Sequence, residues 1–154
     1  MSVIDEFVQL CRDEANSVSR LVVLLEQEQA LLIQGEEHKL EELADSKSGV
    51  LDELAQQSAA RGRLMSALGV LDRDTLYIWL ADKPPACEAW TWLEDAVNRA
   101  QSINQLNGSF VSEKLAVIEE SLLVLRTAAA ATLGYDRGGN QPDVVSGRRL
   151  LGSA

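Results

Sequence analysis

Histidine and cysteine are scarce in this chain of 154 residues, and their scarcity excludes most kinds of catalytic or metal site. His38 is the single histidine, so a di-iron helical bundle, which uses two Glu-x-x-His helices, cannot be formed. Cys11 and Cys87 are far apart and form no CxxC pair, which indicates neither a zinc site nor a disulfide framework. Neither a phosphate-loop motif nor a G-x-S-x-G elbow occurs. We therefore expect a protein that is not an enzyme and that uses no metal or cofactor.

His38 leaves one catalytic class to consider, a phosphotransfer bundle with an exposed histidine on a helix. Such modules usually place a lysine three residues after the histidine and a small residue next. Glu41 and Glu42 occupy those positions here, and two carboxylates would repel a phosphoryl group. The sequence therefore favours a solvated turn around His38, with phosphotransfer kept as an alternative.

Basic clusters and long apolar runs are also absent. The formal net charge of -10 argues against nucleic-acid binding, which needs clustered Lys and Arg. No run of about 18 apolar residues occurs, and the N-terminus lacks the basic and apolar regions of a signal peptide. We therefore expect a soluble, cytoplasmic protein without stable membrane insertion.

Aromatic residues make up only 5% of the chain, although 46% of the residues are hydrophobic. A core of Leu, Val, Ile and Ala favours helices packed on helices. The predicted fold is all-α, an elongated antiparallel bundle of three long helices with coiled-coil-like packing and one extra short helix. The expected helices are 2–34, 37–69, 73–82 and 86–133, which together form a bundle over 1–133. Residues 134–154 contain five glycines and no helical period, which predicts a flexible tail.

The first helix carries the most regular apolar stripe in the chain. Its positions alternate steps of four and three, a seven-residue repeat that predicts coiled-coil packing: Ile4, Val8, Cys11, Ala15, Val18, Val22, Leu25, Gln29 and Leu32. Cys11 is therefore expected to be a small core residue. Ser2 is placed to cap this helix at its start, and Gly35 at its end.

Two later segments contain residues that disfavour helix. The patch 45–49, with sequence DSKSG, permits a bend in the second helix. Pro84 and Pro85 predict an extended corner before the last helix. Trp79, Trp90 and Trp92 flank this corner, and the favoured interpretation is a hydrophobic lid on the bundle, with a ligand pocket as the alternative.

The last helix, 86–133, would be roughly 70 Å long, about 20 Å longer than its partners at the rise of an α-helix. Asn104 and Asn107 interrupt its stripe, and we interpret them as buried register pins. Residues 122–133, LLVLRTAAAATL, are apolar almost all the way round and must be buried on every side. That surface is covered by the protein itself or by a partner, and the residues alone do not decide between these.

The chain resembles the FlgN family of flagellar export chaperones in several stretches. The resemblance rests on the hairpin sequence LEELADSKSGVLDEL, the late sequence NQLNGSFVSEKLAVIEESLLVL and TLGYDRGG at 132–139. Tyr135 and Gly139 keep the family's spacing between its tyrosine and a following glycine, whereas Gly134 precedes the tyrosine instead of following it.

The resemblance implies a cytoplasmic type III export chaperone for the hook-filament junction proteins FlgK and FlgL. Such a chaperone holds the C-terminal helical segment of its client and brings it to the export apparatus. The tail, with Tyr135 as an aromatic anchor, is then expected to contact the export-gate component FlhA or to fold over the groove. From the apolar segment we predict these client-binding residues: Val117, Ile118, Leu122, Val124 and Leu125, flanked by Leu115 and Leu123. A structural coiled-coil protein that only self-associates, for instance as a homodimer, is the competing interpretation.

Overall fold

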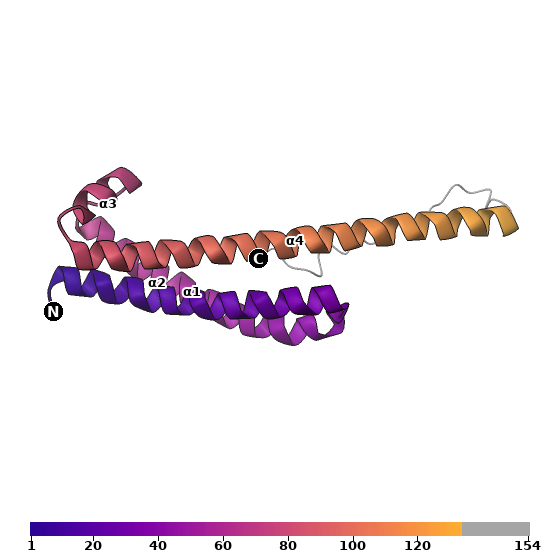
Figure 1. The fold of residues 1–154 in the computed structure, drawn as a ribbon, viewed down its shortest axis with the longest axis horizontal. Coiled ribbons are helices and arrows are strands. Elements are labelled where there is room, and N and C mark those ends of the chain that lie inside the picture. Colours follow the sequence, from indigo (N-terminus) through magenta and orange to yellow (C-terminus); the bar gives the residue numbers. More distant parts are fainter. Residues whose placement is uncertain (134–154) are drawn as a thin grey trace. The chain divides into compact units, whose positions relative to one another are not determined.

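The computed structural model describes the backbone of residues 1–133, and all their side chains except those of 118, 121, 122 and 124–133 (Figure 1). The elements in chain order are α1 (Val3–Gln34), the short 3-10 helix η1 (Glu37–Lys39), α2 (Leu40–Ala67), α3 (Arg73–Leu80) and α4 (Pro84–Leu133). No strand occurs among residues 1–133. The all-α prediction, with long helices packed on one another, is confirmed. The predicted flexible tail, 134–154, lies outside the described residues.

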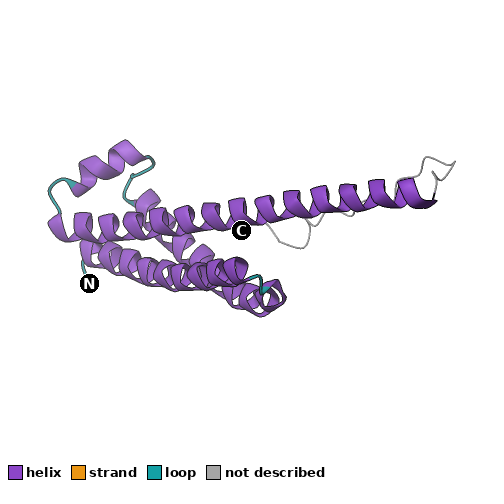
Figure 2. Ribbon diagram, turned by 45° about the vertical axis from the view of Figure 1, so that its right-hand side comes forward, coloured by secondary structure: helices purple, strands orange, loops and turns teal. Residues whose placement is uncertain are grey.

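The chain divides into two compact units, and each is described here by itself. The first unit spans Met1–Asn107 and holds α1, α2, α3 and the first part of α4. The second begins at Gly108, and its described part is the remainder of α4. The backbone of α4 is nevertheless helical without a break from Pro84 to Leu133, and Figure 2 draws it as a single coiled ribbon.

Local hydrogen bonds determine both ends of α1. The Ser2 hydroxyl oxygen accepts from the Asp5 backbone N–H at 3.1 Å, and the Asp5 carboxylate accepts from the Ser2 N–H at 3.2 Å, a capping box. The Ser2 hydroxyl also donates to the Asp5 carboxylate at 2.7 Å, and this bond, together with that from the Ser2 N–H, lowers the pKa of the Asp5 carboxyl, because both bonds favour its charged form. Gly35 ends the helix at a φ of 73°, a left-handed conformation that glycine adopts without strain.

The core of the first unit is built mainly on α1. Six positions of the predicted stripe are buried: Cys11, Ala15, Val18, Val22, Leu25 and Leu32. Phe7 is also fully buried, and the core is completed from α3 and α4 by Leu76, Leu80, Ala86, Ala89, Leu93 and Ala100. The Cys11 thiol is a core group as predicted, and burial raises its pKa to about 12.

α2 packs antiparallel to α1 through three ion pairs. Arg61 binds Glu14 at 2.6 Å, Arg20 binds Glu53 at 2.7 Å, and Lys47 binds Glu28 at 3.1 Å. As the α1 residue number rises, that of its α2 partner falls, which is the register of an antiparallel pair. No residue of α2 is buried, so this helix depends on polar contacts and on side chains that are only partly covered.

α1 and the first part of α4 run in the same direction. Phe7 contacts Trp90 near the start of both helices, and Leu25 accepts a hydrogen bond from Asn107 further along both. α2 is therefore antiparallel to both of these helices. The bundle is closed by α3, which Asp72 caps by accepting from the Thr75 N–H at 2.7 Å.

The two helix-breaking segments behave differently from the expectation. The extended corner predicted at Pro84 and Pro85 is wrong, because both residues belong to the first turn of α4. Proline fits there, since the first N–H groups of a helix have no partner within it and the ring fixes a helical φ. The patch 45–49 does not interrupt α2, which is continuous from Leu40 to Ala67.

Two of the three tryptophans near the corner, Trp79 and Trp90, form the predicted hydrophobic lid. The Phe7 ring centroid lies 5.0 Å from that of Trp79, edge to face, and 6.5 Å from that of Trp90. Such pairs stabilise a core beyond the area they bury. Trp92 is 45% exposed and takes no part in this cluster. The lid therefore consists of Phe7, Trp79 and Trp90.

Candidate functional site

The second unit presents apolar side chains on the helix α4. Val117 is 62% exposed and Leu123 is 61% exposed, whereas Phe110, Val111 and Leu115 are partly covered. Among the side chains that the structure describes, that of Asn107 is the last buried one along the chain. A contiguous apolar patch marks an interaction surface, whereas single exposed apolar residues are normal on any protein.

The helix is continuous here because nothing in its sequence interrupts it. Gly108 is helical, and a Cβ at this position would meet no atom within 4 Å, so close packing does not require a glycine there. The Lys114 ammonium lies 5.1 Å from the centroid of the Phe110 ring, one helical turn earlier. This cation-π contact covers part of the ring.

The predicted partner-binding residues occupy more than one side of α4. Positions 115, 118, 122 and 125 are three or four residues apart and follow one face of the helix, while 117 and 124 follow another. Position 123 lies on neither. Side chains are described for Leu115, Val117 and Leu123 only. The partner-binding assignment therefore stays a prediction, and Tyr135 lies outside the described residues.

Asn107 ties α4 to α1 in the first unit. Its side chain is 2% exposed, and its amide nitrogen donates to the Leu25 carbonyl at 2.9 Å and to the Glu28 carboxylate at 3.0 Å. A buried amide with two specific acceptors suits the register role that the sequence predicts. Asn104, one turn earlier, is only partly buried.

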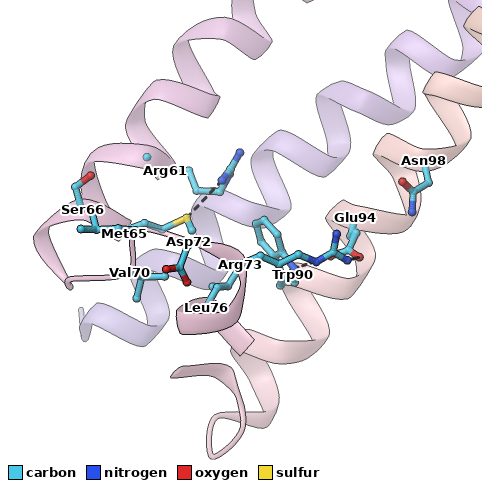
Figure 3. Close-up of a pocket in the computed structure, with 12 residues that line it drawn as sticks. Arg61, Met65, Ser66, Val70, Asp72, Arg73, Leu76, Trp90, Glu94 and Asn98 are labelled. Atoms are coloured by element: carbon cyan, nitrogen blue, oxygen red, sulfur yellow. Dashed lines mark hydrogen bonds and ion pairs between the residues drawn. The ribbon is translucent and has the colours of Figure 1, made fainter. Parts of the chain in front are cut away.

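An open groove of about 630 Å³ lies in the first unit where α2, α3 and α4 meet (Figure 3). Met65, Val70, Leu76 and Trp90 form its apolar lining, and Arg61, Arg73 and Glu94 its charged edge. A ligand pocket at the tryptophan corner was an alternative from the sequence, and Trp90 lines this groove. The other walls come from the end of α2 and from α3, and no local signal in the sequence indicates how these approach α4.

The charged groups around the groove are bound to one another. Arg61 pairs with Glu14 and lies 5.3 Å from the centroid of the Trp90 ring. Glu94 accepts from Arg73 at 3.0 Å, from the Tyr77 hydroxyl at 2.8 Å and from the Trp90 indole N–H at 2.8 Å. These bonds hold α3 on α4, which is a structural role.

Within residues 1–133, no group of three or more His, Cys, Asp and Glu side chains is placed to hold a metal ion. His38 is exposed and belongs to η1, a three-residue helix. Of the helices in this part of the chain, none has an apolar stretch long enough to span a bilayer.

A family model described as FlgN protein matches residues 1–143, which includes every helix of the structure. No curated protein and no solved structure matches the chain significantly.

Proposed function

The chain belongs to the FlgN family of flagellar export chaperones, and from this premise we propose that it binds the C-terminal helical segments of the hook-filament junction proteins FlgK and FlgL. The family match supports the general chaperone role and agrees with the resemblance in the sequence. The observation that carries the proposal is that α4 after Asn107 exposes large apolar side chains on more than one side: Val117 and Leu123 are both more than half exposed, and neither lies on the face that positions 115, 118, 122 and 125 follow.

An amphipathic client helix suits such a surface. Helix-in-groove recognition uses apolar anchors spaced three or four residues apart, and positions 115, 118, 122 and 125 have that spacing. Each buried Leu-sized side chain contributes about 1.5 to 3 kcal/mol. Four such anchors contribute about 6 to 12 kcal/mol before the cost of association, so a dissociation constant of about 1 μM requires that all four be fully buried.

Co-purification and calorimetry test the proposal directly. The full chain is expected to retain C-terminal fragments of FlgK and FlgL and to bind them with a stoichiometry of about one to one, because one helix surface accepts one client helix. Light scattering on the same samples measures whether the chain is monomeric. A dimer that neither fragment dissociates or binds would instead support a self-associating structural protein.

We propose that the segment 134–154 serves delivery to the export-gate component FlhA rather than client binding. Deleting these residues is expected to change the affinity for the client fragments by less than about threefold, because the predicted client-binding residues other than Tyr135 lie within α4. Binding to the cytoplasmic part of FlhA, measured by calorimetry, is expected to be lost. A deletion that abolished client binding and preserved FlhA binding would reverse the assignment, and Tyr135→Ala tests the aromatic anchor alone.

A further inference from the structure

The two halves of α2 are held on the bundle very differently. The partly buried side chains of α2 that pack against the core are Leu54, Leu64 and Met65, followed by Leu68 just past its end. Residues 40–53 contribute no member to that cluster. The second half also carries Arg61, whose guanidinium binds Glu14 through two nitrogens and covers Trp90. The core cluster therefore packs against the second half only.

The first half of α2 is loosely packed against α1. An open surface groove of about 470 Å³ runs between the two helices, lined by Leu24, Leu31, Leu43 and Ser46 among others. Neither η1 nor α2 has a side-chain hydrogen bond that caps its start. Segments with few buried contacts and uncapped ends are those that open locally at low cost in free energy.

Of the polar bridges between this half of α2 and the other helices, the one through Glu28 is the most shielded from water. The Glu28 carboxylate of α1 accepts from the Lys47 ammonium of α2 at 3.1 Å and from the Asn107 amide of α4 at 3.0 Å. The side chains of Lys47 and Glu28 are 14% and 20% exposed, so the pair is mostly shielded from water. By contrast, Arg20 and Glu53, the next pair along α2, are 55% and 45% exposed, and exposed pairs contribute little.

The bridge is also incompletely satisfied. The side-chain oxygen of Asn107 is buried without a hydrogen-bond partner among the described residues. A buried acceptor without a hydrogen bond lowers the free energy of unfolding. A partly satisfied polar network is therefore less stable than a fully satisfied one. Asn107 is the last residue of the first unit, immediately before Gly108.

We propose that residues 40–53 of α2 open from α1 as a local unit, and that the bridge Lys47–Glu28–Asn107 controls this opening. Loss of the bridge releases the first half of α2 and loosens the last turn of α4 within the first unit, while the half of α2 that Arg61 and the core hold stays closed. This local opening is a property separate from the proposed client binding and does not depend on it.

Hydrogen exchange of the full chain, followed by mass spectrometry, tests the proposal. In the unaltered protein, amides of 40–53 are expected to exchange at least about tenfold faster than those of 56–67, because they lack core contacts. Glu28→Gln is expected to accelerate exchange about tenfold further in 40–53 and also in 103–107. The substitution removes the negative charge of the acceptor and so weakens its hydrogen bonds to both Lys47 and Asn107. Exchange in 56–67 is expected to change by less than about twofold.

Two variants separate the bridge from general destabilisation. Lys47→Met removes only the α2 side of the bridge, so it is expected to accelerate 40–53 without affecting 103–107. Glu53→Gln, which breaks the exposed pair with Arg20, is the matched control and is expected to change neither segment. Equal protection of both halves of α2 in the unaltered protein would overturn the proposal. So would equal acceleration of both halves by Glu28→Gln, or the same pattern from Glu53→Gln.

Discussion

Replacing Leu122 and Leu125 together with aspartate is expected to weaken client binding by at least about 100-fold. Two buried leucines contribute about 3 to 6 kcal/mol to an interface, and each 1.4 kcal/mol corresponds to a factor of ten in affinity. The new carboxylates would in addition have to lose water on binding. Isothermal calorimetry with a C-terminal client fragment measures the loss, and circular dichroism checks that the helices remain.

A control at the same spacing makes this test specific. Ser109 and Ser112 are exposed residues of the same helix, three positions apart as Leu122 and Leu125 are. The double change Ser109→Asp with Ser112→Asp adds the same charge and is expected to leave affinity within about threefold, because exposed substitutions away from an interface have small effects. An unchanged affinity in the leucine variant, with helicity intact, would remove these residues from the proposed surface.

Replacing Arg61 with alanine is expected to lower the free energy of unfolding by about 3 kcal/mol or more. The Arg61 side chain is 18% exposed, and that of Glu14, which it binds through two nitrogens, is only 7% exposed. Removing the arginine leaves a buried carboxylate without its partner and uncovers one face of Trp90, a kind of change that is strongly destabilising. Urea denaturation followed by circular dichroism measures the loss.

Two further variants identify the cause of that destabilisation. Arg20→Ala breaks the exposed pair with Glu53 on the same two helices and is expected to cost about 0.5 kcal/mol or less. Replacing both members of the buried pair, Glu14→Leu with Arg61→Met, is expected to recover much of the stability, because no charge then remains buried alone. Equal losses from Arg61→Ala and Arg20→Ala would show that burial of the pair does not matter.

The helices themselves could largely be predicted from short stretches of sequence. The capping box at Ser2, the left-handed Gly35 and the cap at Asp72 each depend on residues within a few positions, and the structure contains all three. The stripe of α1 is a seven-residue repeat that its buried residues follow. Such features are local in the chain, because they depend on backbone hydrogen bonds and on helical periodicity.

Other features depend on which helices approach one another. No periodicity predicts that α2 has no buried residue and is attached by Arg61, Glu53 and Lys47 to carboxylate and guanidinium groups of α1. The two tryptophans on α4 are chemically alike, and only packing against Phe7 distinguishes the covered Trp90 from the exposed Trp92. The groove beside Trp90 likewise requires three elements to meet.

The amino-acid sequence by itself determined the helical class, the stripe and both ends of α1, and the membership of the FlgN family, which the family match over residues 1–143 confirmed. Tertiary structure decided that Pro84 and Pro85 begin a helix, and that Asn107 donates to Leu25 and to Glu28. The reason is physical. Caps and periodicity act over a few residues, whereas the burial of a charge or an amide depends on distant partners that only the folded chain brings together.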